Sequence, residues 1–330
     1  MGTLLVKNIG ILQTPTGSYS HRGSQQGENL KLHNAAIFVE DGVVAEITSE
    51  GELPKRSVNA DEVIDANYAL VTPGLVDGHT HLVFGGYRQH EIPMKLKGAT
   101  YLDILRAGGG ILDTVRKTRE ASEQDLIFKT KKFLDEMMAY GVTSCEAKSG
   151  YGLDFDNEVK ILNVIKTLDE QHAMDVVATF MGPHAIPEEY KGKGNEFIDM
   201  ICEKILPYVK EHDLADFADI FTEDSVFNYE QSKRYLEHAQ ELGFGLKIHA
   251  DEIEAIGGSE LAGEMGAVSA EHLISIDKEG LDSMAKGGTT AMCLPATSFY
   301  LGANFAPARK MIEMEIPVAA ASDFCDCYAG

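Results

Sequence analysis

Central to this sequence is the segment Val71-Thr72-Pro73-Gly74-Leu75-Val76-Asp77-Gly78-His79-Thr80-His81-Leu82, an apolar run that ends in two histidines. Alternate side chains of a β-strand project from the same face, so we expect His79 and His81 to point the same way. Imidazole is the commonest nitrogen ligand for cations such as Zn²⁺ or Fe²⁺, so this pair offers half of a tetrahedral site. Two histidines in a polar loop are an equally good interpretation of an isolated His-x-His.

The composition is typical of a globular protein and excludes several classes of partner. The chain has 330 residues, of which 44% are hydrophobic and 25% charged, enough for one large barrel or two smaller domains. A formal charge of −23 argues against nucleic acid and anionic membranes as partners, but not against a small anionic ligand in a locally basic pocket. The sequence shows neither a long apolar run nor a secretory leader, and its five cysteines form no framework. We therefore expect a cytoplasmic protein with reduced thiols, and a homodimer is left open.

The first 70 residues predict a small β domain. Glu40-Asp41-Gly42 is a hairpin signal between two of its strands, and residues 13–29 have the composition of an exposed loop. So few strands cannot bury both faces of a sheet, so we expect a partial, composite β-sandwich that another segment completes. The expected strands are Thr3–Val6, Ala35–Val39, Val43–Ile47 and Glu62–Asp65.

Residues 71–330 alternate between apolar strands and helices, which predicts a parallel sheet covered on both sides. The expected helices are Leu126–Tyr140, Asn157–His172, Glu196–Val209, Glu230–Leu242 and Asp277–Ala285. The eight expected strands are Leu75–His81, Val142–Ala147, Asp175–Met181, Phe217–Thr222, Gly245–His249, Ala267–His272, Thr289–Leu294 and Ile316–Ser322. Eight strands at this spacing favour an α/β fold closed as a (β/α)₈ TIM-like barrel, and an open doubly wound sheet is the alternative.

The barrel interpretation predicts a metal site, because chemistry in that fold gathers at the C-terminal ends of the strands. Those ends carry His79 and His81 on the first strand, His249 on the fifth and Asp323 on the eighth. Three nitrogens and a carboxylate suit one Zn or Fe ion with a position left for water, whose pKa such a cation lowers to about 7. A buried structural histidine at 249 and a turn residue at 323 are the alternatives.

Three further strand ends offer catalytic and binding groups. Glu252, three residues beyond His249, can transfer protons, and His272 can hydrogen-bond water or a substrate carbonyl. Asp323 can accept a hydrogen bond from the metal-bound water. The alternative role of Glu252 and His272 is to support the metal ligands. Arg88, Tyr101, Tyr151 and His184 follow the first three strands, and a guanidinium beside phenols predicts a clamp for a substrate carboxylate. A surface arginine with packed tyrosines fits the same residue types.

The segment Pro73–His81 resembles the opening signature of the amidohydrolase superfamily, and four later motifs resemble the imidazolonepropionase family within it. The similarity extends from about residue 1 to Phe324. The four motifs are Thr80-His81-Leu82-Val83-Phe84-Gly85-Gly86-Tyr87-Arg88, Arg106-Ala107-Gly108-Gly109-Gly110-Ile111, Lys148-Ser149-Gly150-Tyr151-Gly152-Leu153 and Thr179-Phe180-Met181-Gly182-Pro183-His184.

The resemblance implies hydrolysis of the ring amide of 4-imidazolone-5-propanoate to N-formimidoyl-L-glutamate, in histidine degradation, with one divalent or trivalent Zn or Fe ion. It implies that His79, His81, His249 and Asp323 bind the metal, and that Arg88, Tyr151, His184 and Glu252 contact substrate. Glu252 and His272 would then be the catalytic helpers.

The sequence departs from the family after Phe324. The family continues with Asn-Pro-Gly, whereas this chain reads Cys325-Asp326-Cys327-Tyr328-Ala329-Gly330. We expect a truncated or frame-shifted sequence that lacks the last barrel helix and the strands completing the β domain, and therefore poor stability, with Leu4, Val6, Ile37 and Val39 losing apolar cover. Two other functions stay open: a heterocycle aminohydrolase (a deaminase), and a catalytically impaired metal-binding fragment.

Overall fold

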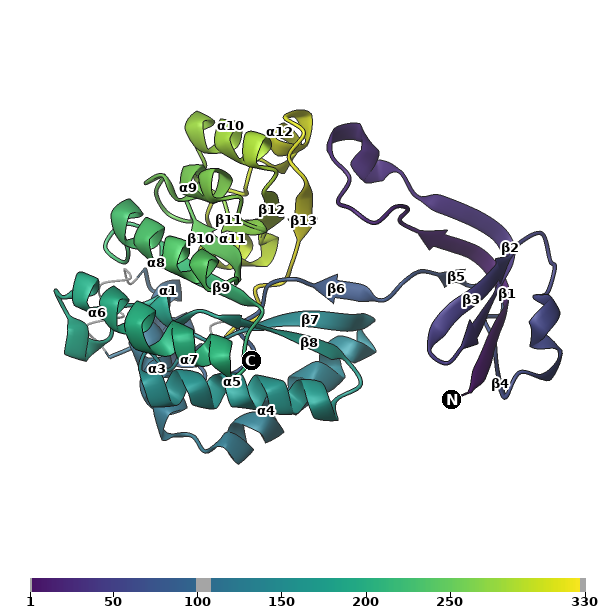
Figure 1. Cartoon of the computed structure of the whole chain (residues 1–330), viewed down its shortest axis with the longest axis horizontal. Helices are drawn as coiled ribbons and strands as arrows, with labels where there is room; N and C mark the ends of the chain where they lie inside the picture. Colours follow the sequence, from purple (N-terminus) through teal and green to yellow (C-terminus); the bar gives the residue numbers. More distant parts are fainter. Residues whose placement is uncertain (1, 99–107, 327–330) are drawn as a thin grey trace. The chain divides into compact units, whose positions relative to one another are not determined.

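The computed structural model describes residues 2–98 and 108–326 and divides the chain into two compact units, Met1–Gly74 and Leu75–Gly330 (Figure 1). The first unit contains a β-sheet and the second an α/β barrel. Each unit is described by itself.

The N-terminal unit is built around the long strand β1 (Thr3–Thr14), which pairs with three of the other four strands. The antiparallel partner is β2 (Leu30–Glu40), while β4 (Glu62–Asp65) and β5 (Leu70–Val71) run parallel to β1. The fourth, β3 (Val43–Thr48), pairs with β2 across a turn in which Asp41 and Gly42 have φ of 52° and 80°, as a tight primed hairpin turn requires. The predicted hairpin is confirmed.

The sheet is more extensive than predicted, because β2 begins at Leu30 instead of Ala35 and β5 was not predicted. β1 extends to Thr14 instead of ending near Val6, and a register shift between Val6 and Ile9 interrupts its pairing with β2. Asn8 has a φ of 56° there, a conformation that asparagine tolerates better than most residues, so the strand continues past the irregularity. The four side chains expected to lose apolar cover, Leu4, Val6, Ile37 and Val39, are half-buried.

The second unit contains eight parallel strands, whose hydrogen-bonded order follows the sequence from β6 to β13. They are β6 (Leu75–Asp77), β7 (Val142–Lys148), β8 (Asp175–Phe180), β9 (Phe217–Thr222), β10 (Gly245–Ala250), β11 (Ser269–His272), β12 (Thr290–Cys293) and β13 (Val318–Ala320). A parallel bridge between Thr80 and Phe324, just beyond β6 and β13, brings the first and last strands together. The nearly closed barrel confirms the predicted (β/α)₈ fold and argues against the open doubly wound sheet.

Helices surround the strands, and the long ones lie where their amphipathic periodicity predicts them (Figure 1). These are α4 (Glu123–Ala139), α5 (Phe155–Gln171), α8 (Tyr229–Glu241) and α10 (Lys278–Gly287). The predicted helix Glu196–Val209 is instead α6 (Gly194–Met200), a π-turn (Ile201–Ile205) and α7 (Leu206–Glu211). Pro207 has no amide hydrogen to continue the α-helical pattern, which accounts for the irregular turn just before it.

Several shorter helices were not predicted, because short or glycine-rich segments carry little periodic signal. They are α1 (Ile92–Leu96), α9 (Gly258–Met265), α11 (Pro295–Leu301) and α12 (Ala308–Glu313). A further helix, α3 (Ile111–Glu120), begins directly after the Gly108-Gly109-Gly110 segment.

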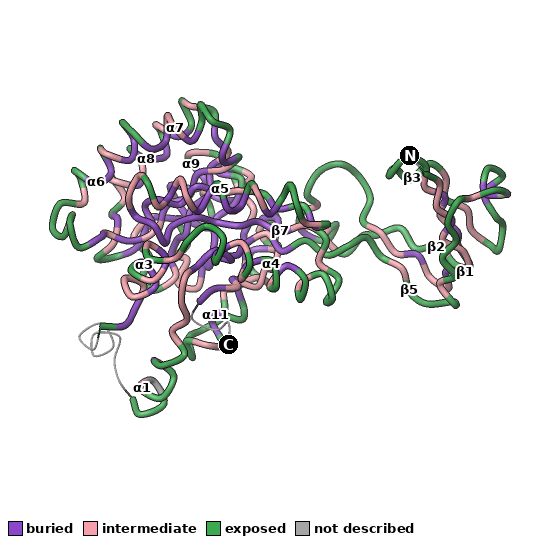
Figure 2. Tube along the Cα trace, turned by 90° about the horizontal axis from the view of Figure 1, so that it is seen from below, coloured by how far each residue is buried: buried purple, intermediate pink, exposed green. Residues whose placement is uncertain are grey.

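Burial in the second unit is concentrated on the barrel strands and the inner faces of the helices (Figure 2). Within the described residues, no helix is both long enough and apolar enough to cross a membrane.

Candidate metal centre and active site

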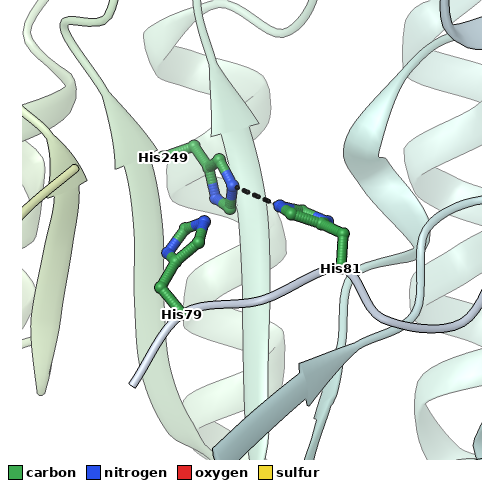
Figure 3. A group of neighbouring side chains, drawn as sticks. All are labelled: His79, His81 and His249. Carbon is green, nitrogen blue, oxygen red and sulfur yellow. Dashed lines mark hydrogen bonds between the residues drawn. The ribbon is translucent and has the colours of Figure 1, made fainter. Parts of the chain in front are cut away.

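Three histidine side chains converge at the C-terminal end of the barrel (Figure 3). His249 lies on β10, whereas His79 and His81 follow the end of β6 at Asp77, so the first strand is shorter than predicted. The backbone still holds both residues in place, because Asp323 N donates to His79 O (3.0 Å) and His81 N donates to Phe324 O (2.8 Å). The barrel closure itself therefore positions the histidine pair.

The four residues predicted as metal ligands lie together and are buried. The Nε2 atoms of His81 and His249 are 3.3 Å apart. Asp323 Oδ1 lies 3.4 Å from His79 Nε2 and 3.6 Å from His81 Nε2. Two triads have ligand atoms within 4.8 Å of one another: His79 with His81 and His249, and His79 with His272 and Asp323.

Carboxylates behind two of the rings orient their Nε2 atoms toward the centre. His79 Nδ1 is 2.7 Å from Glu271 Oε2, and His249 Nδ1 is 3.0 Å from Asp219 Oδ2. A carboxylate facing Nδ1 keeps the hydrogen on that nitrogen and leaves the Nε2 lone pair free to bind a cation. Three imidazole nitrogens and one carboxylate oxygen form a donor set that fits a single divalent transition metal.

The electrostatics at this centre favour a positive charge. Burial lowers the pKa of both His81 and His249 well below the usual value, so these rings are neutral. Burial and Lys148 also oppose protonation of His79, but Glu271 and Asp323 outweigh them and raise its pKa to about 9. Burial alone would raise the pKa of Asp323, yet the surrounding histidines hold it well below its usual value. The centre thus combines two neutral imidazoles and an ionised carboxylate with a third ring, His79, which must release a proton before it can bind a cation.

Beneath the histidines, the barrel interior contains five buried charged residues that form one network. Lys148 Nζ lies 2.8 Å from Asp219 Oδ2 and 2.9 Å from Glu146 Oε2. Lys247 Nζ lies 3.0 Å from Glu146 Oε1 and 3.5 Å from Glu271 Oε1. Because both lysines are paired with carboxylates, the network keeps Asp219 and Glu271 ionised behind the histidine rings.

The two predicted proton-transfer residues lie beside the metal centre. His272 Nε2 is 3.8 Å from Glu252 Oε2. Burial raises the pKa of Glu252, and His272 only partly opposes this, so the carboxyl group retains a proton more readily than an exposed glutamate does. A carboxyl group with a raised pKa beside a histidine can exchange protons with a bound molecule.

The predicted carboxylate clamp is partly assembled. Arg88 and Tyr151 converge on one carboxylate, that of Asp326: Arg88 Nη2 is 3.3 Å from its Oδ1, and Tyr151 OH donates to the same oxygen at 2.6 Å. The His184 ring stacks on His81 with centroids 4.8 Å apart, and burial lowers its pKa to about 4, so it is neutral. Tyr101 lies outside the described residues.

Three of the four candidate metal ligands line one cavity of about 190 Å³, together with the residues of the predicted clamp. These three are His81, His249 and Asp323, whereas His79 is fully buried. The lining also includes Glu252, His272, Arg88, Tyr151 and His184. Most of the groups predicted to bind metal and substrate therefore share one cavity.

Several residues that lie behind the candidate ligands were not predicted from the sequence. Asp219, Lys247 and Glu271 were not assigned roles, and neither was Thr297, whose hydroxyl donates to Asp323 Oδ2 at 2.5 Å. One signal was available: Lys247 precedes His249 by two residues, so both side chains face the barrel interior. A lysine facing inward in a parallel barrel strand needs a buried carboxylate partner.

Comparison with known proteins identifies close relatives over nearly the whole chain. The imidazolonepropionase of Bacillus velezensis is 48% identical over 321 residues, which cover 97% of this chain and 76% of the relative. The imidazolonepropionase of Bacillus mycoides is 49% identical, with coverage of 98% and 76%. That of Clostridium tetani is 45% identical, with coverage of 98% and 77%. No family model matches the chain.

Solved structures with the same fold are much more distant in sequence. A 5-methylcytosine deaminase from Klebsiella pneumoniae liganded with 5-fluorocytosine has a TM-score of 0.68 at 14% identity, covering 98% of this chain and 75% of that one. An adenosine deaminase from Xanthomonas campestris with bound Zn has a TM-score of 0.62 at 15% identity, covering 98% and 69%. These support the barrel alone, whereas the sequence relatives are identical to this chain at almost half of the aligned positions. The chain therefore belongs to the imidazolonepropionase family of hydrolases.

Proposed function

We propose that this protein hydrolyses the cyclic amide of 4-imidazolone-5-propanoate to N-formimidoyl-L-glutamate, a step of histidine degradation. Membership of the imidazolonepropionase family supports this assignment. The observation that carries it is the arrangement of one cavity, with a candidate metal centre on one wall and a carboxylate-binding pair, Arg88 and Tyr151, on another. Hydrolysis of a heterocyclic propanoate needs a metal centre for the ring amide and a binding pair for the carboxylate.

One Zn or Fe ion is proposed at His79, His81, His249 and Asp323. A cation at these ligands would supply Lewis acidity, which makes water nucleophilic near neutral pH. Glu271 and Asp219 hold two of the rings in the ligating tautomer, and Thr297 holds the Asp323 carboxylate. Ring nitrogens suit both metals, so the donor set is compatible with either.

The remaining polar side chains are proposed to bind the substrate and to move protons. Arg88 and Tyr151 bind the propanoate carboxylate, and Tyr101 is proposed to join them. His184 is neutral and donates from Nδ1 to Gly150 O at 3.1 Å, so its Nε2 can accept from the ring N–H of the substrate.

Proton transfer is assigned to Glu252, with Asp323 accepting a hydrogen bond from the attacking water. Glu252 takes a proton from water and returns it to the ring nitrogen as the C–N bond breaks, which its raised pKa favours. His272, adjacent to Glu252, polarises the ring carbonyl by hydrogen bonding.

Turnover assays with simultaneous ammonia and metal analysis test this proposal. We expect loss of 4-imidazolone-5-propanoate absorbance without ammonia release from the metal-loaded protein. Ammonia release would instead identify an aminohydrolase, and bound metal without turnover would identify a catalytically impaired metal-binding protein.

His249→Ala tests the ligand assignment in the same assay, and we expect it to lose both metal and turnover. The matched control is His33→Ala, at an exposed position of β2, which should retain both. Full metal occupancy in His249→Ala would contradict the ligand set.

A further inference from the structure

The carboxylate clamp already holds a carboxylate that belongs to the protein itself. Asp326 follows the last barrel strand, and its side chain contacts three clamp-side residues: Tyr151 OH at 2.6 Å, Thr114 Oγ1 at 2.5 Å, and the Arg88 guanidinium through Nε and Nη2. Arg88 N also donates to Asp326 O at 3.1 Å, so backbone and side chain are both held.

The pairing is buried and electrostatically strong. Asp326 is 1% exposed, Tyr151 is 2% exposed and Thr114 is fully buried. Burial by itself would lower the pKa of Arg88, but the Asp326 carboxylate outweighs it and leaves the pKa above the usual value. A charge pair removed from water in this way is neutral as a unit, so the guanidinium has little attraction left for a second anion.

We propose that Asp326 is an intramolecular competitor for the substrate's carboxylate. This inference rests on the proposed function, because it takes the ligand of the clamp to be a propanoate. The substrate binds Arg88 and Tyr151 only after the Asp326 carboxylate has left them, so its apparent affinity falls by the fraction of molecules in which the clamp is open. This loss of affinity affects only ligands with a carboxylate, since other ligands do not bind Arg88 and Tyr151.

Two ligands that differ only in this group test the proposal by titration calorimetry on the metal-loaded protein. They are 3-(imidazol-4-yl)propanoate and the carboxylate-free 4-propylimidazole. In the unaltered protein we expect the two dissociation constants to agree within about threefold. The reason is that Asp326 occupies the clamp, so the ligand's carboxylate adds little binding energy. A preference of tenfold or more for the propanoate in the unaltered protein would overturn the proposal without any variant.

The variant Asp326→Asn keeps the shape of the side chain and removes its charge. We expect the propanoate to bind about tenfold or more tightly to this variant, with 4-propylimidazole unchanged, and KM for the substrate to fall in parallel. The matched control is Asp199→Asn, which removes the carboxylate from another Asp–Arg pair, 3.1 Å from Arg234 on the surface, and should alter neither affinity. Equal or weaker propanoate binding in Asp326→Asn would contradict the competition.

Binding and turnover separate this inference from the proposed function. If the affinities follow the expected pattern while imidazolonepropanoate is not consumed, Asp326 competes for the clamp and the proposed reaction is wrong. If the reaction proceeds and Asp326→Asn leaves propanoate affinity unchanged, the reaction is right and the competition is wrong.

Discussion

At the scale of single residues, two of the candidate metal ligands are oriented by carboxylates that do not line the cavity. Glu271 accepts from Ser269 at 2.5 Å while its other oxygen faces His79 Nδ1 at 2.7 Å. This fixes both the position of the carboxylate and the tautomer of the ring. Two hydrogen bonds behind the site thus decide which nitrogen of His79 is available to a metal.

We predict that Glu271→Gln weakens metal binding by about 10- to 100-fold, because a neutral amide holds the imidazole less strongly in its ligating tautomer. Competition with a chelator of known affinity measures the change. Glu264→Gln, whose carboxylate accepts from Tyr229 at 2.8 Å on the surface, is the control and should bind metal normally. Unaltered metal affinity in Glu271→Gln would show that Glu271 does not orient the His79 ring for metal binding.

At the scale of elements, the loop between β7 and α5 is shaped by one buried side chain. Glu158, in the first turn of α5, accepts from the backbone N–H groups of Gly150 (3.0 Å), Gly152 (2.8 Å) and Leu153 (2.8 Å). Gly150 has a φ of 109° and Gly152 has no room for a Cβ, which would lie 2.6 Å from the Asn157 carbonyl carbon. The loop therefore needs both glycines and the glutamate to present Tyr151 to the clamp.

We predict that Glu158→Gln lowers the free energy of unfolding by about 1–3 kcal/mol, because one amide oxygen cannot satisfy three buried donors. The displaced loop should raise KM for the substrate more than it lowers kcat, since Tyr151 is proposed to bind the substrate's carboxylate and not the reacting bond. Chemical denaturation and steady-state kinetics give the two values.

Glu170→Gln, at an exposed position on the same helix, is the matched control and should leave stability and KM unchanged. A Glu158→Gln protein with unaltered stability and KM would show that the loop keeps its shape without this carboxylate.

At the scale of the whole barrel, the candidate metal site lies where the first and last strands meet. The bridge between Thr80 and Phe324 joins the two ends of the sheet, and residues on either side of it, His79, His81 and Asp323, are candidate ligands. A cation at these residues would link the first strand to the last across the seam, the junction at the bridge between Thr80 and Phe324. Binding energy at the site is then also energy that holds the barrel closed.

We predict that Zn²⁺ at about 100 times its dissociation constant raises the free energy of unfolding by about 2.7 kcal/mol, relative to the chelator-treated protein. Thermal and denaturant unfolding, with and without the metal, give this difference. The increment should vanish in His249→Ala. Equal stability of the metal-free and metal-loaded proteins would exclude a cation at the seam.

The sequence by itself determined the barrel strands, the long helices and the candidate ligands, because all three give local signals. Strand and helix periodicity predicted all eight barrel strands, and residue type at strand ends predicted His79, His81, His249 and Asp323 before any contact was known. Resemblance, and not periodicity, supplied the identity of the ring that the family hydrolyses.

Only the tertiary structure decided how those residues are supported and what the clamp contains. Asp219 and Glu271 gain their roles from the ring nitrogens they face, and Asp326 meets Arg88 across 238 positions of sequence. Such pairings depend on barrel closure and on the orientation of buried side chains. Neither of these can be predicted from the periodicity of the sequence. The histidine pair could be predicted from the sequence, whereas the contact of the Asp326 carboxylate with the clamp could be found only in the tertiary structure.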